Sequence, residues 1–310
     1  MTPIRVRERL KEMLGDRCAF DVPMAPLMTW RVGGKADCLA RPQTVEELSA
    51  IMHICSEHNE QVRVVGAGSN ILVLDGGLRG ITILMRQGFD RFAPDFLTGD
   101  RVRLTLGAAL GMNQAVDLCA QANIAGLEFI AGVPGSIGGG VRMNAGTTRG
   151  DFAGVLEEVE VVDADGRVRQ IPREKLDYRY RGLVIDGMFV VTQAHLALRR
   201  GEGADIRAIA DRIIRWRIEH HPMDKFSAGS TFKNPEGDHA GRLIEEAGLK
   251  GYTIGGAQVS EKHANFLINT GRATAADLLA LIEHVRTAVH DQFGVMLEPE
   301  VKIWGERDVS

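Results

Sequence analysis

The chain has 310 residues, which is enough for two or three packed units rather than one small domain. Hydrophobic residues make up 45% and charged residues 25%, the composition of an ordinary globular protein. The net charge of −4 excludes a broad cationic surface for nucleic acid, although it allows a local basic pocket for a small anion.

The N-terminal stretch and the cysteines indicate a compartment. No long apolar run follows residues 1–7, so we expect no signal peptide and no membrane span. The cysteines Cys18, Cys38, Cys55 and Cys119 lie far apart and form no Cys-x-x-Cys pair. This pattern is typical of buried thiols in a reducing compartment, not of a disulfide framework or a metal site. We therefore expect a cytoplasmic protein.

The N-terminal portion is predicted to be rich in strands. After a short leading helix, a second helix runs to about His58, with Thr44 as N-cap and Glu47 bonding back in a capping box. Asp165-Gly166 is a hairpin signal, which pairs residues 155–162 with 168–171. Further strands are predicted over residues 61–65, 71–74, 81–84, 102–106 and 189–198.

Composition shifts over residues 199–203, which we interpret as a domain boundary. The helix beyond it has an apolar face made of Ile206, Ile209, Ile213 and Trp216. A second helix over residues 243–247 is ended by Gly248. A third is capped by Thr274 and has an apolar face made of Leu278, Ile282, Val285 and Val289. With a final strand over 301–304, the irregular mixture predicts an α+β fold.

The first of two glycine-rich segments is Val-Gly-Ala-Gly-Ser-Asn-Ile, residues 65–71. Its backbone N–H groups, with Ser69 and Asn70, can bind a phosphate. A Rossmann fingerprint fails because Ile71 stands where the third glycine should be and because a strand follows instead of a helix. A Walker A loop is absent because Ala36 follows Gly34-Lys35. Taken alone, the segment is equally typical of a tight structural turn.

The second segment is a loop over residues 131–140, Ala-Gly-Val-Pro-Gly-Ser-Ile-Gly-Gly-Gly, continuing to Asn-Ala-Gly at 144–146. Such a density of glycine is costly in conformational entropy unless something needs the bare backbone. A crossover turn at a domain junction accounts for one or two of these glycines, whereas a bound cofactor accounts for all. Two such segments favour a diphosphate held from two sides, and so a dinucleotide such as FAD.

In this order the motifs resemble the UDP-N-acetylenolpyruvoylglucosamine reductase (UDP-N-acetylmuramate dehydrogenase) family. The resemblance starts at Thr-Trp-Arg-Val-Gly-Gly over residues 29–34 and includes both glycine segments and Tyr-Arg-Tyr-Arg at 178–181. It continues through Gly-Ser-Thr-Phe-Lys-Asn-Pro at 229–235 and Val-Ser-Glu-Lys-His-Ala-Asn-Phe at 259–266, and ends at Leu-Glu-Pro-Glu-Val, 297–301. No tyrosine lies between Tyr180 and Tyr252, so the chain resembles the form of the family that lacks an extra tyrosine-bearing loop.

The resemblance implies an α+β fold in three parts. A helical lead over residues 1–25 precedes a PCMH-type FAD-binding module over 26–199, whose two subdomains divide near 85. A UDP-sugar-binding domain then covers 200–310. The residues expected to hold FAD without a covalent bond are Gly66, Ala67, Gly68, Ser69, Asn70, Ile71, Gly132, Val133, Pro134, Ser136, Gly138, Gly139, Asn144 and Ala145. A monomer without a protein partner is expected.

The family reaction implies roles for three residues. Hydride from NADPH, carried by FAD, reaches the terminal carbon of an enolpyruvyl ether, so negative charge collects on the next carbon and its carboxylate. The resemblance makes Ser230 the proton donor for that carbon. It makes Arg181 the cation for the carboxylate, although Arg181 alone would be interpreted as a solvated rim charge. It selects Glu300 in protonated form, whereas the residues themselves do not separate Glu300 from Glu298.

Further residues are expected to bind the substrate. These are Tyr180, Lys233, Asn234, Lys262 and His263. Lys233 has two open roles, as a stabiliser of the Ser230 alkoxide and as a ligand of an anionic group. Lys262 and His263 are about equally well interpreted as a surface pair.

Two other functions remain open from the residues. One is another flavin oxidase or dehydrogenase on the same framework, often with histidine-linked flavin, but neither glycine segment contains a histidine. The other is a non-catalytic nucleotide-binding module, which would leave Arg181, Ser230 and Glu300 without a joint purpose.

Overall fold

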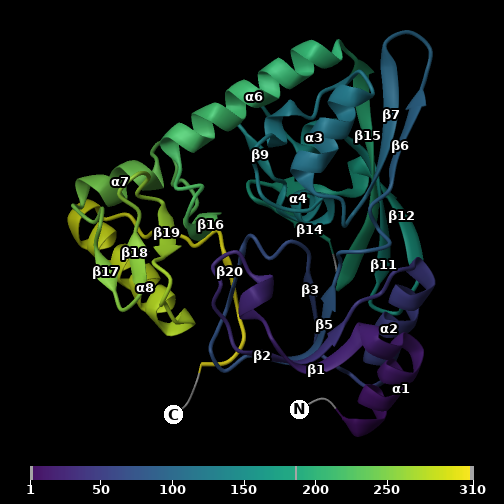
Figure 1. Cartoon of the computed structure of the whole chain (residues 1–310), viewed down its shortest axis with the longest axis horizontal. Helices are drawn as coiled ribbons and strands as arrows, with labels where there is room; N and C mark the ends of the chain where they lie inside the picture. The colour runs from purple at the N-terminus through teal and green to yellow at the C-terminus, as the bar shows by residue number, and fades with distance from the viewer. Residues whose placement is uncertain (1–2, 186, 308–310) are drawn as a thin grey trace. The chain divides into compact units, whose positions relative to one another are not determined.

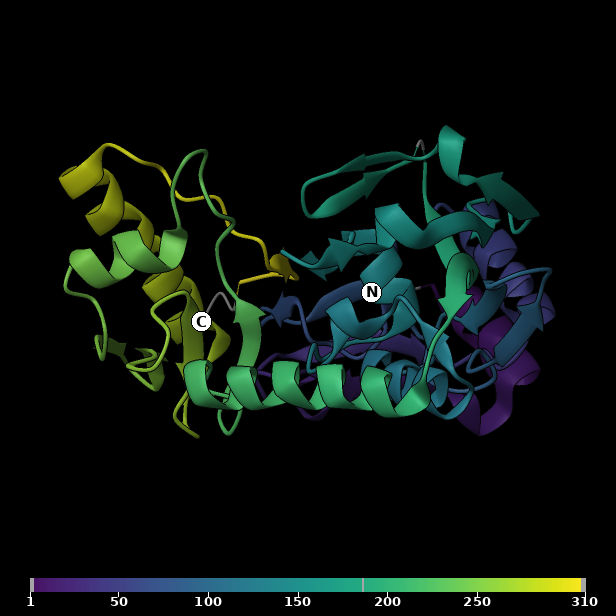
Figure 2. The same ribbon diagram turned by 90° about the horizontal axis from the view of Figure 1, so that it is seen from above.

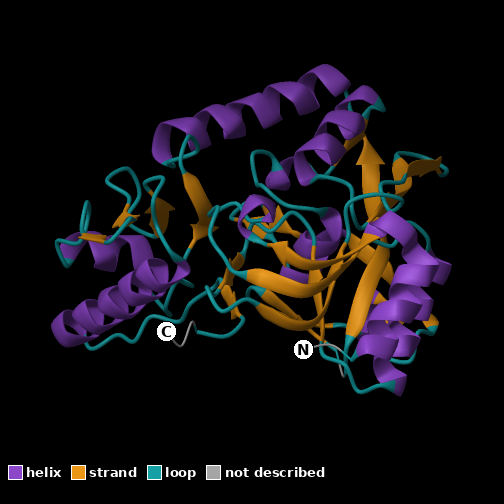
Figure 3. Cartoon of the chain, turned by 60° about the horizontal axis from the view of Figure 1, so that its bottom comes forward, coloured by secondary structure: helices purple, strands orange, loops and turns teal. Residues whose placement is uncertain are grey.

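The computed structural model describes residues 3–185 and 187–307 (Figure 1). The chain divides into two compact units. Unit 1 comprises Met1–Phe20, Cys38–Ala67 and Gly80–Arg215, and unit 2 comprises Asp21–Asp37, Gly68–Arg79 and Trp216–Ser310. Each unit is therefore assembled from three separate stretches of the sequence. Helices and strands are mixed in both, so the predicted α+β class is confirmed (Figure 3).

Unit 1 begins with α1 (Ile4–Leu14) and the 3-10 turn η1 (Gly15–Arg17). Helix α2 (Val45–Glu57) begins as predicted, because the Thr44 side chain accepts a hydrogen bond from the Glu47 N–H. The Glu47 carboxylate accepts from the Gln43 N–H at 2.8 Å and forms a bidentate pair with Arg17. Arg17 holds the pKa of Glu47 at about 2. Glu47 therefore joins the start of α2 to η1.

A four-stranded sheet has the order β1 (Cys18–Pro23), β2 (Lys35–Ala40), β5 (Leu78–Leu84) and β3 (Val62–Val65). The boundary between the units falls within β1, β2 and β5. Strands β3 and β5 confirm two predicted strands and pair in parallel. Helices α1 and α2 bury Leu10, Leu48 and Ile51 in a core shared with Ile81 and Ile83 of β5.

The six-stranded sheet of unit 1 has the order β12 (Val168–Pro172), β11 (Leu156–Asp163), β15 (Phe189–Arg200), β7 (Arg101–Gly107) and β6 (Phe92–Phe96). Strand β8 (Ile124–Ala125) adds to β15. The predicted hairpin is confirmed, with Val162 opposite Val168, although residue 155 ends a preceding helical turn, α5 (Phe152–Val155). The sheet buries alternate residues such as Leu104, Val159 and Leu196 with helix α3 (Met112–Gln121).

The second glycine segment corrects the sequence-based prediction of a loop. After the turn η3 (Glu128–Ile130) and residues 131–136, the chain forms helix α4 (Ile137–Met143), whose N-cap is Ser136. A Cβ on Gly138 would lie 2.8 Å from the Cβ of Ala108, and one on Gly140 would lie 2.5 Å from the Phe152 ring. Close packing therefore compensates the poor helix propensity of these glycines.

Short hairpins complete unit 1. Strands β9 (Gly146–Thr147) and β10 (Gly150–Asp151) form one pair, and β13 (Asp177–Arg179) and β14 (Gly182–Val184) another, after the turn η4 (Arg173–Lys175). Helix α6 (Gly203–His220) is unbroken (Figure 2), and the boundary between Arg215 and Trp216 falls within it. Ile206 and Ile213 are buried as predicted, but Trp216 is 52% exposed, and its indole stacks on His220 with ring centroids 4.5 Å apart.

Unit 2 contains a sheet in the order β16 (Phe226–Ser230), β19 (Phe266–Asn269), β18 (Ala257–Val259) and β17 (Thr253–Ile254). Helices α7 (Ala240–Glu246) and α8 (Ala275–Phe293) confirm the predicted helices, and Gly248 follows α7 in the left-handed region. Thr274 and Asp277 form a complete capping box on α8. The predicted apolar face of α8 is fully buried.

The core of unit 2 also takes residues from the N-terminal part of the sequence, which includes the turn η2 (Ala25–Leu27). Trp30 is fully buried, and its Nε1 donates to the Leu267 carbonyl at 2.8 Å. Strand β4 (Ile71–Val73) pairs in parallel with the final strand β20 (Lys302–Trp304), and Leu72 packs in the same core. Among the described residues, no helix combines the length and apolarity needed to cross a membrane.

Candidate active site

Ser230 is the last residue of β16, and a β-bulge precedes it. Ser227 lies opposite Ile268 of β19, whereas Ser230 lies opposite Phe266, so β16 carries one extra residue between these pairs. Gly229 lies in this bulge with φ of +78°, in the left-handed region that favours glycine. No atom lies within 4 Å of a Cβ built on Gly229, so its backbone conformation, rather than crowding, requires glycine. In the described structure, no hydrogen bond occupies the half-buried Ser230 hydroxyl.

The segment after Ser230 pairs with the segment that contains Glu300. The Glu300 N–H donates to the Thr231 carbonyl at 2.8 Å, and the Lys233 N–H donates to the Glu298 carbonyl at 2.9 Å. Phe232 forms an antiparallel bridge with Pro299. Ser230 and Glu300, separated by many residues in sequence, are therefore brought together on adjacent backbone segments of unit 2.

Glu298 and Glu300 differ in their surroundings. Glu298 is exposed, and its carboxylate forms an ion pair with the Lys233 ammonium. Glu300 is half-buried, and its carbonyl accepts a hydrogen bond from the Asn70 side chain at 3.4 Å. The structure thus places Lys233 beside Glu298, and it places a predicted cofactor residue, Asn70, beside Glu300.

Asn265 is a residue of this site that sequence reasoning missed. It is 3% exposed, its Oδ1 accepts from the Phe232 N–H at 2.9 Å, and its Nδ2 donates to the Phe232 carbonyl at 2.8 Å. Its own carbonyl accepts from the Thr231 N–H at 2.8 Å. The available signal was a single amide side chain directly before the apolar run Phe266-Leu267-Ile268.

Arg181 lies in unit 1, in the two-residue turn between β13 and β14. Its φ of +58° is uncommon for a residue other than glycine, and such conformations are often found at functional sites. Its guanidinium donates to the Gly146 carbonyl at 3.2 Å and lies over the ring of Tyr180, 5.0 Å from the centroid. Tyr180 is 55% exposed, whereas Arg179 is paired with Asp177.

The first glycine segment passes from unit 1 to unit 2 between Ala67 and Gly68. A Cβ on Gly66 would lie 2.4 Å from the Ser136 Oγ, so the two glycine segments are in contact at this point. A Cβ on Gly68 would lie 2.4 Å from the Leu27 carbonyl oxygen, and Ile71 is the first residue of β4. Half-buried Ser69 lies between them. Internal packing therefore requires both glycines, as a structural turn would.

The predicted cofactor residues of the second segment differ in their surroundings. Ser136 caps α4, Gly138 packs on Ala108, and the Asn144 side chain bonds Ala153 and Asp151, so all three have structural partners. Half-buried Val133 and exposed Pro134 follow Gly132, and half-buried Ala145 follows Asn144.

Part of this segment fits a dinucleotide. Gly139 is exposed, and its missing Cβ would meet only the Ser136 Oγ, at 3.4 Å. Gly132 has a φ of +72°, and its N–H is held by Asn113. Packing does not require glycine at Gly139, so its exposed backbone leaves room for a dinucleotide.

The remaining predicted substrate residues also have partners in unit 2. The Asn234 Oδ1 accepts from the Ala240 N–H at 3.1 Å, at the start of α7. Lys262 donates to the Ile218 carbonyl. The His263 ring packs against His221 and Phe266, each 5.1 Å away between centroids, and burial lowers the pKa of His263.

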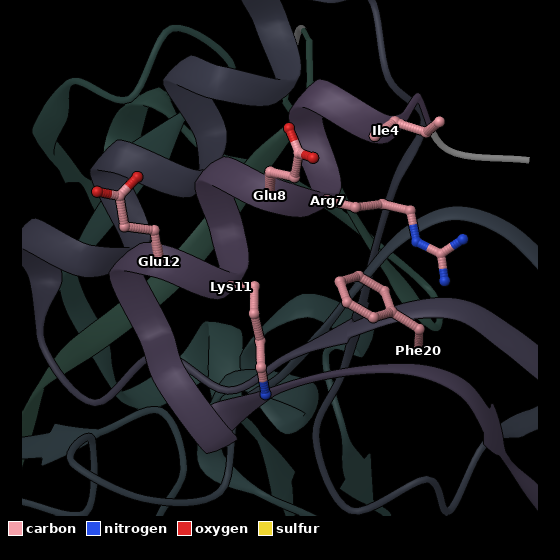
Figure 4. Close-up of a pocket in the computed structure, with 6 residues that line it drawn as sticks. All are labelled: Ile4, Arg7, Glu8, Lys11, Glu12 and Phe20. Atoms are coloured by element: carbon pink, nitrogen blue, oxygen red, sulfur yellow. The ribbon is translucent and has the colours of Figure 1, made fainter.

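A pocket lies on the surface of α1 and β1 (Figure 4). It has a volume of about 640 Å³, and it is lined by Ile4, Arg7, Glu8, Lys11, Glu12 and Phe20. None of the predicted site residues lines it. In the described residues, no group of three or more His, Cys, Asp or Glu side chains is placed to hold a metal ion.

Comparisons with known proteins agree along nearly the whole chain. Family models match residues 36–171 as an FAD binding domain and residues 221–304 as the C-terminal domain of UDP-N-acetylenolpyruvoylglucosamine reductase. Reductases of that name from Clostridium beijerinckii and Desulfosudis oleivorans are each 42% identical, over 93% and 97% of this chain and 93% and 98% of their own. The crystal structure of the Thermus caldophilus enzyme has a TM-score of 0.78 and 35% identity, and covers 92% of this chain and 98% of its own.

The fold and these matches define an FAD-dependent oxidoreductase with a PCMH-type FAD-binding module and a C-terminal domain. The chain belongs to the UDP-N-acetylenolpyruvoylglucosamine reductase family. The family resemblance and the FAD cofactor predicted from the sequence are thereby confirmed.

Proposed function

We propose that this chain reduces the enolpyruvyl double bond of a UDP-sugar with Ser230 as the proton donor. The reaction is the NADPH-dependent reduction of UDP-N-acetylglucosamine enolpyruvate to UDP-N-acetylmuramate, in peptidoglycan precursor synthesis. The observation that carries the role of Ser230 is the bulged end of β16, which lies next to the backbone that bonds Glu300.

The reduction adds one hydride and one proton across the double bond. The chemistry that bound FAD supplies is hydride transfer from NADPH to the terminal methylene carbon of the substrate. Ser230 Oγ then donates its proton to the neighbouring carbon, which is basic enough to take it from an alcohol. Arg181, with its permanent charge, stabilises the adjacent carboxylate, and Glu300 in protonated form stabilises the same charge. A solvent proton restores the Ser230 hydroxyl.

Binding roles follow from the same residues. We assign FAD to the backbone around Gly66 and Gly139, and the UDP-sugar to Tyr180, Lys233, Asn234, Lys262 and His263. Because Lys233 is paired with Glu298, the substrate's anionic groups compete with that carboxylate for it. We further propose that residues 200–310 form the UDP-sugar-binding domain, and that the protein works as a cytoplasmic monomer.

One experiment tests the reaction. The purified chain should have the visible spectrum of a flavoprotein, and acid precipitation should release FAD into the supernatant. NADPH oxidation should depend on the enolpyruvyl UDP-sugar and consume one NADPH for each UDP-N-acetylmuramate formed. A protein that takes up no FAD, or that oxidises NADPH at the same rate without the sugar, would contradict the proposal.

A further inference from the structure

Asn265 bonds the two residues that follow β16, beyond the end of its pairing with β19. The ladder between β16 and β19 ends with Ser230 opposite Phe266. The next two residues, Thr231 and Phe232, are buried, so their backbone groups need partners inside the protein. The Asn265 carbonyl bonds the Thr231 N–H, and the Asn265 amide bonds both the N–H and the carbonyl of Phe232. Asn265 therefore supplies, through its backbone carbonyl and its side-chain amide, the hydrogen bonds that a strand partner would supply.

The opposite edge of the same two residues holds Glu300. The Thr231 carbonyl accepts from the Glu300 N–H at 2.8 Å, and Phe232 is bridged to Pro299. The Thr231 hydroxyl accepts from the Leu267 N–H at 3.4 Å, which ties the segment to β19 a third time. Thr231 and Phe232 are thus bonded to Asn265 on one side and to residues 299–300 on the other.

From this arrangement we propose that Asn265 is a positioning residue, which fixes Ser230 relative to Glu300 through residues 231–232. The inference rests on the proposed roles of Ser230 and Glu300. The Asn265 side chain is buried, and both its amide oxygen and its amide nitrogen bond Phe232. It therefore acts through the backbone and not by contact with the substrate. A displacement of about 1 Å at a reacting group costs roughly 10²-fold in rate, so loss of this clamp should slow protonation.

The variant that tests the inference is Asn265→Asp, which keeps the shape and removes the N–H donor to the Phe232 carbonyl. Asn269 offers a matched control at the other end of β19. It is 5% exposed, its Nδ2 donates to the Trp30 carbonyl at 2.9 Å, and its Oδ1 accepts from two backbone N–H groups. Asn269→Asp removes an equivalent buried bond, but Asn269 lies opposite Phe226, at the start of β16, not opposite Ser230.

Each variant is measured in five ways: thermal unfolding, FAD content, the Kd for the enolpyruvyl UDP-sugar, the rate of flavin reduction by NADPH, and the rate at which the sugar reoxidises the reduced enzyme. Both variants should lose similar thermal stability and keep the NADPH rate within about twofold. Only Asn265→Asp should slow reoxidation, by at least about tenfold, with the Kd for the sugar little changed. Reoxidation within twofold of the parent protein, or an equal loss in Asn269→Asp, would overturn the inference.

Ser230→Ala separates this inference from the proposed function. If the parent protein is not reoxidised by the enolpyruvyl UDP-sugar, the proposed function fails, and if Ser230→Ala leaves reoxidation intact, the proton-donor role of Ser230 fails. If Ser230→Ala abolishes reoxidation while Asn265→Asp does not slow it, only the positioning role fails. In the double variant, Ser230→Ala should cost less than it does alone, because the two residues act on one step. If Asn265→Asp does not accumulate as folded protein, Asn265→Ser is compared with Asn269→Ser instead. The smaller serine side chain leaves room for water to bond the backbone groups that asparagine bonded, which should preserve folding.

Discussion

Gly229 shows how a single backbone conformation can serve the chemistry of the next residue. In an unbulged strand, neighbouring side chains alternate between the two faces of the sheet, and an extra residue changes which face the following side chains occupy. The left-handed φ at Gly229 creates that extra residue directly before Ser230. The conformation of Gly229, and not crowding, is therefore the reason for glycine at this position.

Gly229→Ala should therefore reduce both stability and rate. A side chain in the left-handed region costs about 1–2 kcal/mol, so the free energy of unfolding should fall by that amount. Reoxidation by the sugar should slow as Ser230 shifts, while flavin reduction by NADPH should be unchanged. The measurements are chemical denaturation and stopped-flow absorbance of the flavin.

Gly248→Ala provides the control for that prediction. Gly248 has a φ of +72°, and nothing lies within 4 Å of its Cβ position, so the backbone cost should match that of Gly229. Gly248 follows α7, away from the bulge, and its variant should keep both rates. Equal slowing of reoxidation in the two variants would contradict the link between the bulge and Ser230.

At the scale of elements, α8 and α4 mark what the sequence does and does not predict. Helix α8 was predictable because Thr274 and the buried stripe from Leu278 to Val289 are local signals. Helix α4 was not, because glycine disfavours a helix and the compensation comes from Ala108 and Phe152, which only the folded structure brings near. Asn265 was missed for the same reason, since its partners, Thr231 and Phe232, lie just after β16 and far from it in sequence.

The start of α2 yields a pH-dependent prediction. The bidentate pair with Arg17 lowers the pKa of Glu47 from its ordinary value of 4.5 to about 2. A depressed carboxyl pKa stabilises the fold above the unfolded-state pKa, and the contribution is lost as pH falls from about 4.5 to about 2. Glu47→Gln should therefore lower the free energy of unfolding at pH 7 by about 1 kcal/mol.

The difference between Glu47→Gln and the parent protein should stay constant from pH 7 to just above 4.5 and shrink as the pH falls further, and it should be followed by denaturant titrations between pH 7 and 3. Glu46→Gln, on the same first turn of α2, serves as the control because Glu46 has no Arg17 partner in the described contacts. A difference that stays constant over this range would show that Glu47 does not contribute through its charge.

At the scale of the molecule, the two compact units are not continuous in sequence. The sequence-based division, at residues 25, 85 and 199, is in linear order. Unit 2, however, contains Trp30 and Leu72 in the core that α8 completes, and Asp75 accepts hydrogen bonds from Ala275 and Ala276 at the start of that helix. Contacts between segments so distant in sequence carry no local signal. The linear division itself remains a prediction.

Because unit 2 is built from segments distant in sequence, we can predict how a C-terminal fragment behaves. Residues 200–310 expressed alone would lack Trp30, Leu72 and Asp75, so the fragment should lose core area and the Asp75 hydrogen bonds at the start of α8, and it should fail to unfold cooperatively. Circular dichroism during thermal unfolding and amide NMR dispersion measure this, with the whole chain as reference. A fragment with a cooperative transition and well-dispersed amide signals would instead mark residues 200–310 as an independent domain.

The central claim is that Ser230 donates the proton to the reduced sugar. It is tested most directly by stopped-flow measurement of both half-reactions in Ser230→Ala, with Ser227→Ala on the same strand as the control. Ser230→Ala should leave flavin reduction by NADPH nearly intact and slow reoxidation by the enolpyruvyl UDP-sugar by about 10²–10⁴-fold, while Ser227→Ala should change neither. An equal loss in both half-reactions, or undiminished reoxidation, would contradict the assignment.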